Sequence, residues 1–143
     1  MKKVEPGKGR VKEIGVRKAH GEYADVRLVG EALEEFDALE PKTDEKSVRK
    51  HRTVSRYFQR FADLGPKSLD DRMFKSQSRM KSSGTEVMIH EFKAHQFRIY
   101  GVVCEYDGRR CFIGTACDPE KKQDKADPKK LQKAADEYVR IMK

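Results

Sequence analysis

The sequence contains no apolar run that approaches the roughly 20 residues needed to cross a lipid bilayer. Its beginning, MKKVEPGKGR, also lacks the apolar stretch of a secretory signal peptide. No membrane partner is therefore expected, and the predicted location is the cytoplasm.

Cysteine is scarce, because the chain has only Cys104, Cys111 and Cys117, an odd number without the CxxC spacing typical of zinc sites. A disulfide framework and a zinc site are both disfavoured, and buried thiols on neighbouring strands are the simplest interpretation. Tryptophan is absent, but 7 Phe and 5 Tyr supply ordinary core material. No metal and no organic cofactor is expected.

Charge, by contrast, is plentiful: 39% of the 143 residues are charged, and the formal net charge is +8. A chain of this length forms one domain with one modest core. Clustered Lys and Arg side chains attract the phosphates of a nucleic acid, and binding releases the counterions that the phosphates had held. The composition therefore favours an acidic partner such as RNA, although ribosomal, nucleoid and membrane-surface proteins share it.

Residues 1–21 are rich in Lys, Arg and Gly, which predicts a basic N-terminal arm, with a short strand around Val11–Val16. This arm could grip a phosphate backbone or be a solvated tail. The folded domain is then expected to span residues 22–143. Its first elements are a strand at Tyr23–Val29 and a helix at Glu31–Leu39.

A longer helix is predicted to start after Thr43 or Asp44 and to stop at Gly65 and Pro66. Its apolar stripe, at three- and four-residue steps, predicts burial against the rest of the domain. The stripe consists of Val54, Tyr57, Phe58, Phe61 and Leu64. Residues 66–84 show no periodic pattern, so a loop, or a short helix followed by a loop, is expected there.

Three strands are predicted next, at Glu86–Phe92, Gln96–Tyr106 and Arg109–Cys117, and a helix at Leu131–Met142 closes the chain. Asp107-Gly108 indicates a tight hairpin, because both positions tolerate a positive φ. The order is strand, helix, helix, three-stranded meander, helix. It predicts an α+β domain with a small, mostly antiparallel sheet.

Four arginines of the long helix recur at three- and four-residue steps and share one face, namely Arg49, Arg52, Arg56 and Arg60. From Asp44 to Lys81 there are 11 Lys and Arg against 5 Asp and Glu. Arg52, Arg56 and Arg60 are therefore expected to stay exposed and to bind RNA. The alternative is an ordinary solvated helix face.

The order of elements and a few short motifs resemble the RelE/HigB family of bacterial and phage toxins. The stretch QFRIYG at 96–101 looks like the family's aromatic-Arg-aliphatic-aromatic strand, and Lys121-Lys122 looks like its basic pair before the last helix. YADVRLVGEALEEF resembles its first strand and helix. The resemblance covers residues 22–142 and implies a RelE-like α+β fold.

Members of this family with known activity are endoribonucleases that usually cut mRNA on the ribosome and are neutralised by an antitoxin protein. The resemblance implies that Arg98 stabilises the charge on the reacting phosphate, together with Lys121 and Lys122. His90 and His95 are the candidates for proton transfer. The residues expected to hold the RNA backbone beside them are Arg79, Lys81 and Lys93.

Other interpretations of the same residues stay open. Several family toxins carry a Tyr or His shortly after the last strand, whereas here the first is Tyr138, so a non-catalytic relative that binds nucleic acid or protein is a rival. Arg98 could simply pair with Glu91 or Glu105.

Two metal-dependent sites are also conceivable from the residue types. Asp70-Asp71 with Glu91 and Lys93 resembles the acidic and ExK residues of magnesium-dependent nucleases. His90 and His95 are spaced wrongly for a zinc protease helix.

Overall fold

A computed structural model describes residues 13–120 and 125–143. The first four elements are β1 (Val16–His20), β2 (Asp25–Leu28), α1 (Gly30–Asp37) and α2 (Glu45–Leu64). A short 3-10 turn, η1 (Pro66–Ser68), leads to β3 (Phe74–Ser82), β4 (Thr85–Ala94), β5 (Phe97–Tyr106), β6 (Arg109–Asp118) and α3 (Pro128–Met142). The broad prediction of an α+β class is confirmed. None of the described helices is both long and apolar enough to span a membrane.

The six strands form one open sheet in the order β1-β2-β6-β5-β4-β3. All neighbours are antiparallel except β2 and β6, which run parallel with Val26 beside Phe112. β1 lies within the segment that was expected to be an arm, so this part of the segment belongs to the sheet. It is an edge strand, because β2 is its one neighbour among the described strands. The start of that arm, residues 1–12, lies outside the described residues.

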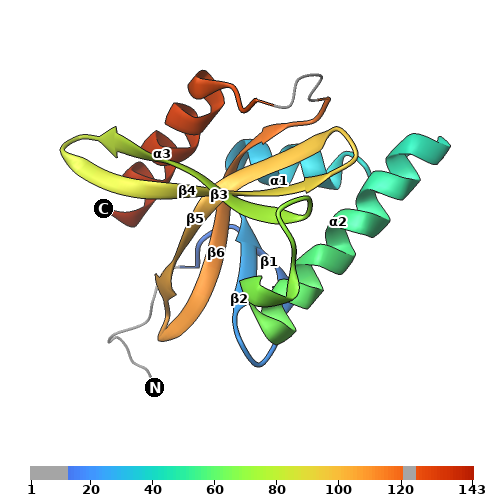
Figure 1. Cartoon of the computed structure of the whole chain (residues 1–143), viewed down its shortest axis with the longest axis horizontal. Coiled ribbons are helices and arrows are strands. Elements are labelled where there is room, and N and C mark those ends of the chain that lie inside the picture. The colour runs from blue at the N-terminus through green and yellow to red at the C-terminus, as the bar shows by residue number, and fades with distance from the viewer. Residues whose placement is uncertain (1–12, 121–124) are drawn as a thin grey trace, which may run out of the picture.

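Helices cover both faces of the sheet, with α1 and α2 on one side and α3 on the other (Figure 1). Successive residues of a strand point to opposite faces, so Ile99 packs in the core under α1 and α2 whereas Tyr100 packs under α3. Both side chains are fully buried. Two cores therefore share a single sheet, one on each of its faces.

The helix α2 has the boundaries that its capping residues predict. The side chain of Asp44 accepts a hydrogen bond from the Ser47 backbone N–H at 3.0 Å, which caps the first turn. Gly65 ends the helix with a φ of +86°, and a Cβ at this position would meet the ring of Tyr23.

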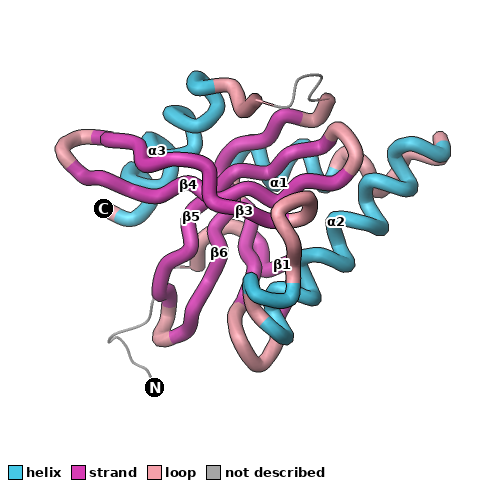
Figure 2. Tube along the Cα trace, viewed as in Figure 1, coloured by secondary structure: helices cyan, strands magenta, loops and turns pink. Residues whose placement is uncertain are grey.

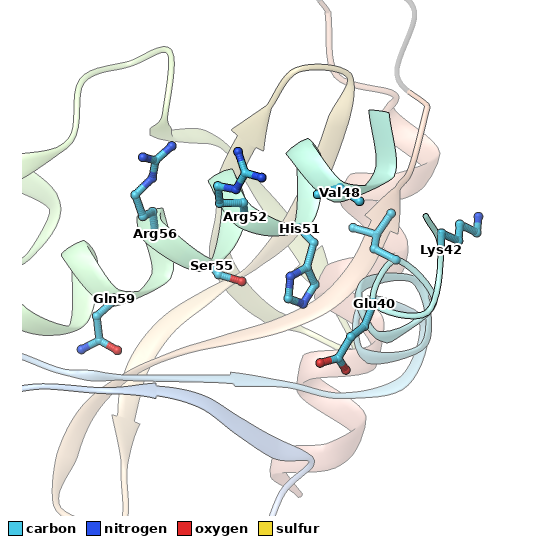
Figure 3. Close-up of a pocket in the computed structure, with 9 residues that line it drawn as sticks. Glu40, Lys42, Val48, His51, Arg52, Ser55, Arg56 and Gln59 are labelled. Atoms are coloured by element: carbon cyan, nitrogen blue, oxygen red, sulfur yellow. The ribbon is translucent and has the colours of Figure 1, made fainter. Parts of the chain in front are cut away.

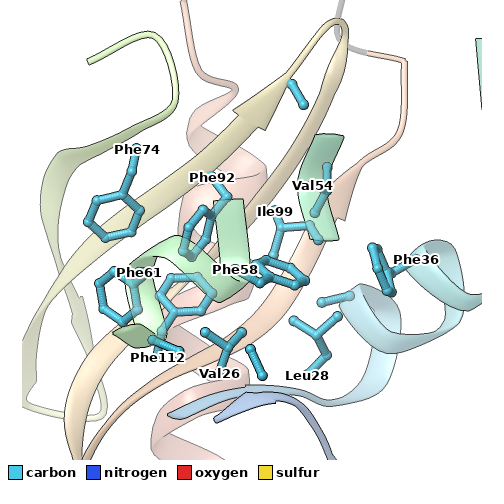
Figure 4. Close-up of a cluster of buried hydrophobic side chains, with 14 of the residues drawn as sticks. Val26, Leu28, Phe36, Val54, Phe58, Phe61, Phe74, Phe92, Ile99 and Phe112 are labelled. Atoms are coloured by element: carbon cyan, nitrogen blue, oxygen red, sulfur yellow. The ribbon is translucent and has the colours of Figure 1, made fainter. Parts of the chain in front are cut away.

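The apolar stripe of α2 packs into an aromatic cluster between the helix and the sheet (Figure 4). Phe58 and Phe61 are buried, and their rings meet the edge or face of Phe92 at 5.0 and 5.6 Å. The prediction of a buried stripe is confirmed for both, while Tyr57 is only partly buried. Leu64 was wrongly included, because the last residue of the helix is 63% exposed.

The predicted central hairpin is confirmed. β5 pairs antiparallel with β6, from Arg98 opposite Asp118 to Tyr106 opposite Arg109. Asp107 and Gly108 form the turn with φ values of +54° and +76°, which is the left-handed conformation that a two-residue hairpin requires.

The prediction of a loop through residues 66–84 is wrong beyond η1, because Phe74–Ser82 is strand β3. This strand lies at the edge of the sheet and pairs only with β4, so its sequence shows little apolar alternation. A bulge between Ser76 and Ser78 shifts the register further. Figure 2 shows β3 and β4 as a long hairpin, and Gln132 of α3 donates to the Lys81 carbonyl at 2.8 Å.

Candidate nucleic-acid interface

The exposed side of α2 carries a row of cations that we call the arginine face, consisting of Arg49, Arg52, Arg56 and Arg60. All four side chains are exposed, because they lie on the face of the helix opposite the buried stripe that contains Phe58 and Phe61. The expected exposure of Arg52, Arg56 and Arg60 is thereby confirmed. An α-helix rises about 1.5 Å per residue, so consecutive members of the 52, 56, 60 series are about 6 Å apart along the axis.

The members of the arginine face differ in their contacts. Arg49 lies 3.5 Å from Glu45 one turn earlier, and the Arg60 Nε donates to the Ser68 carbonyl at 2.8 Å. The side chains of Arg52 and Arg56 make no hydrogen bond or ion pair within residues 13–120 and 125–143. Two guanidinium groups in the middle of the row are therefore free to meet an external anion.

Two surface hollows border this face. One of about 510 Å³ lies between α2 and the segment after α1 (Figure 3). Its lining comprises Leu39, Glu40, Lys42, Val48, His51, Arg52, Ser55, Arg56 and Gln59. The other, of about 570 Å³, lies farther along the helix and is lined by Arg56, Tyr57, Gln59, Arg60, Asp63, Leu64 and Met73. Arg56 and Gln59 belong to both, so the hollows adjoin.

His51, Ser55 and Gln59 were not singled out from the sequence. They recur every four residues, directly beside the arginines, and this periodicity is a signal that could have identified them. The opposite wall, formed by Leu39 and Glu40, comes from another part of the chain and required the tertiary structure.

Arg98 is not on this surface. It is 8% exposed, and its Nη1 donates to the backbone carbonyls of His95 at 2.8 Å and Phe97 at 3.3 Å. Its Nε lies 4.0 Å from the carboxylate of Glu91, which is 2% exposed. Of the two pairings that the sequence left open, the one with Glu91 is observed. The guanidinium group of Arg98 is thus engaged by groups inside the protein.

Glu91 and Arg98 belong to a buried polar cluster on the same face of the sheet as α3. The Gln77 amide donates to Glu91 at 2.9 Å. The Tyr100 hydroxyl is buried beside them and has no hydrogen-bond partner among the described residues. Burial raises the pKa of Tyr100, and the negative charges of Glu91 and Asp118 add to this effect. Such a phenol stays neutral at physiological pH.

The imidazoles of the two candidate histidines point to the α2 side of the sheet, although the His95 backbone carbonyl accepts from Arg98. The ring of His90 stacks on Phe74 at 5.4 Å, and burial lowers its pKa. His95 forms the turn between β4 and β5 with a φ of +59°, and its Nε2 lies 3.4 Å from the Thr53 hydroxyl of α2. Partial burial and the charges of Arg49 and Lys50 lower the pKa of His95. Among the described residues, no hydrogen bond or ion pair links either imidazole to the Arg98 side chain.

The other predicted site residues are dispersed. Arg79 and Lys81 are exposed on the edge strand β3, far along the β3–β4 hairpin, and half-buried Lys93 lies opposite Arg98 in the β4–β5 register. Lys121 and Lys122 lie outside the described residues. The segment before them starts at Asp118, opposite Arg98, and the Lys50 side chain donates to the Pro119 carbonyl at 3.1 Å.

The residues of the magnesium-nuclease alternative are not gathered together. The carboxylate of Asp70 accepts hydrogen bonds from the Arg72 backbone N–H at 2.8 Å and from the Arg72 guanidinium group at 3.1 Å. The carboxylate of Glu91 instead faces Gln77 and Arg98. Within the described part of the chain, no three His, Cys, Asp or Glu side chains cluster so that they could hold a metal ion.

The expected buried thiols on neighbouring strands are confirmed for Cys111 and Cys117, while Cys104 is only half-buried. Cys104 and Cys111 lie opposite each other on β5 and β6, and Cys117 lies near the end of β6. Burial raises the pKa of Cys111 to about 12 and raises that of Cys117 as well. Because the thiolate is the reactive form, neither thiol is suited to nucleophilic chemistry.

Comparison with known proteins gives no relative, since no protein-family model and no curated protein matches the sequence. What the chain does must therefore follow from the chemistry of its own surface. Of the two polar regions described above, the arginine face presents charge to solvent, whereas the Glu91 cluster is enclosed.

Proposed function

We propose that this protein binds RNA through the arginine face of α2. One observation carries the proposal: Arg52 and Arg56 are exposed, one helical turn apart, and free of any partner within the described residues. A guanidinium group offers five N–H donors in a planar fork that fits phosphate oxygens. The net charge of +8 would add a long-range attraction to the same polyanion.

The rigidity of α2 supports this role. Phe58 and Phe61 anchor the helix in the aromatic core, and Asp44 and Gly65 fix its two ends. The backbone spacing of the residues that carry the cations is therefore set before any ligand arrives. A preorganised helix strengthens binding, because less backbone freedom is lost on association.

In this proposal the chain is a non-catalytic relative of the RelE/HigB toxins, with a RelE-like order of strands and helices. The enclosure of Arg98 favours binding over cleavage, since a cation that stabilises a reacting phosphate must be able to touch it.

The double variant Arg52→Ala/Arg56→Ala tests the interface. We expect weaker binding to single-stranded RNA and a flatter dependence of affinity on salt. Each lost phosphate contact lowers the slope of log K against log salt by about 0.7, so the two together should lower it by about 1.4. Fluorescence anisotropy of a labelled RNA over a salt titration measures both quantities.

The matched control is Lys129→Ala/Arg140→Ala, which removes the same charge from exposed positions on α3, across the sheet. It should change the slope much less than the α2 variant. Equal effects of the two variants would mean that RNA responds only to net charge, and the arginine face would then be ordinary solvated surface.

A metal-independent endoribonuclease of the RelE/HigB toxin type, acting on ribosome-bound mRNA and held by an antitoxin, is the second candidate. The register favours it, because Arg98 lies opposite Asp118, which is three residues before Lys121 in the sequence. In this mechanism the RNA 2′-OH attacks the adjacent phosphate while basic residues stabilise the charge that develops.

Cleavage has a direct assay. The toxin candidate predicts that the purified protein cuts labelled mRNA, either free in a buffer with EDTA or bound to ribosomes in a buffer with magnesium, and leaves 2′,3′-cyclic phosphate ends. It also predicts growth arrest on expression. Intact RNA under both conditions, together with normal growth, would exclude the nuclease and leave the binding function.

A further inference from the structure

The hollow of about 510 Å³ beside the arginine face has the size of a small-molecule site, which is typically about 300–1,000 Å³. Its apolar wall comes from Leu39, which is buried, and from Val48, which is 37% exposed. When a ligand covers exposed apolar surface inside a concave site, the apolar surfaces of the ligand and of the protein are both removed from water, which favours binding. The hollow is therefore more than a gap between charged side chains.

An aromatic ring forms a second wall of the hollow. His51 lines it, and the imidazole stacks on Phe36 of α1 with ring centroids 4.8 Å apart and planes inclined by 21°. Phe36 itself is 4% exposed and packs on Phe58. The orientation of the His51 ring is thus fixed by the core, which is the condition for a stacking platform.

Hydrogen-bonding groups border the same space. The Gln59 amide nitrogen is fixed by the His20 carbonyl and by Asp63, both at 3.0 Å, and its amide oxygen accepts no hydrogen bond from the described residues. Ser55 and Glu40 add a hydroxyl and a carboxylate to the lining. Donors and acceptors of this kind can recognise the edge of a planar heterocycle.

Cations stand along the rim. In Figure 3, Arg52 and Arg56 extend from one edge of α2, whereas His51, Ser55 and Gln59 lie along the other edge, toward Glu40. A ligand with a flat apolar body and an attached anion would fill the hollow and meet the guanidinium groups at the same time. A nucleotide has this combination.

We propose that this hollow, called the base pocket below, takes an unpaired base of single-stranded RNA while Arg52 and Arg56 hold the flanking phosphates. The inference rests on the proposed RNA-binding function and gives it a substrate class. A base in a duplex is stacked and paired, so only an unpaired base can turn into a lateral pocket. An acidic peptide would satisfy the arginines but offers no planar ring to the His51 wall.

The test compares three probes on the full chain by fluorescence anisotropy. They are a single-stranded RNA of about 12 nucleotides, an abasic ribose-phosphate strand of equal length, and the fully paired RNA duplex. Loss of one base–aromatic stack weakens binding by at least about fivefold. We expect the intact single strand to bind at least that much more tightly than the abasic strand and the duplex.

Filling the base pocket should remove this preference. Ser55→Phe is expected to reduce affinity for the intact strand to that for the abasic strand, without weakening abasic binding. Ser76→Phe is the matched control, since Ser76 is an exposed serine on β3 outside the lining of the pocket. It should leave the preference unchanged, and circular dichroism checks that both variants fold.

The outcomes separate the two proposals. If the wild-type chain binds intact and abasic strands equally, yet Arg52→Ala/Arg56→Ala weakens both, the base pocket is excluded while RNA binding stands. If the arginine variant weakens neither, the proposed function itself fails. If a poly-glutamate peptide competes as strongly as unlabelled RNA does, the partner of this surface is an acidic protein and not a nucleic acid. The wild-type comparison needs no variant, so it decides even if Ser55→Phe does not fold.

Discussion

The variant Phe58→Ala is expected to lower the free energy of unfolding by about 3–5 kcal/mol. The side chain is 1% exposed and contacts the rings of Phe36 at 5.4 Å and Phe92 at 5.0 Å. Truncation removes its burial free energy and leaves a cavity that neighbouring rings on a rigid sheet fill only in part. Urea denaturation, followed by circular dichroism, measures the loss.

Leu64→Ala on the same helix is the control, because Leu64 is 63% exposed. It should change the free energy of unfolding by about 0.5 kcal/mol or less. A similar loss for both variants would mean that α2 is held mainly by its helical propensity and not by the aromatic core. The hollow beside His51 would then lack the fixed wall that Phe36 and Phe58 provide.

Replacing Arg98 by methionine is expected to lower the free energy of unfolding by about 3 kcal/mol. The substitution leaves the Glu91 carboxylate, 2% exposed, with the Gln77 amide but without its cation. It also removes the donor to the His95 carbonyl. A buried charge without a counter-charge is strongly unfavourable, although the long 4.0 Å separation places the cost at the lower end of the usual range.

The double variant Glu91→Met/Arg98→Met should be more stable than Arg98→Met alone, because it removes the uncompensated charge. Both variants should bind single-stranded RNA as the wild-type chain does, since Arg98 lies outside the arginine face. A stable Arg98→Met protein that loses RNA binding or toxicity would contradict the structural role. It would then restore Arg98 to the catalytic position that the family resemblance implies.

The sequence alone determined the features that depend on neighbouring residues. Asp107-Gly108 specified the β5–β6 hairpin, because a two-residue turn needs left-handed backbone at both positions. Asp44 specified the start of α2, because its carboxylate accepts from a free N–H of the first turn, and Gly65 specified the end, because glycine readily takes the positive φ that turns the chain out of the helix. The 3.6-residue period also determined that Phe58 would be buried and that Arg56 would be exposed.

The tertiary structure decided what depends on distant segments. β3 is a strand only because β4 supplies its hydrogen bonds, so its polar sequence gave no sign of it. The parallel pairing of β2 with β6 joins residues that are far apart in the chain, and no local pattern encodes that choice.

The candidate site shows the same division. Periodicity placed the arginines on one helix face, but the hollow beside them exists only because Leu39 and Glu40 are folded against α2. Arg98 has the residue type that phosphate chemistry needs, and its enclosure by Glu91 and two carbonyl groups depends on how the β4–β5 hairpin turns. Residue type and spacing are local properties, whereas accessibility is set by whatever the rest of the chain packs against them.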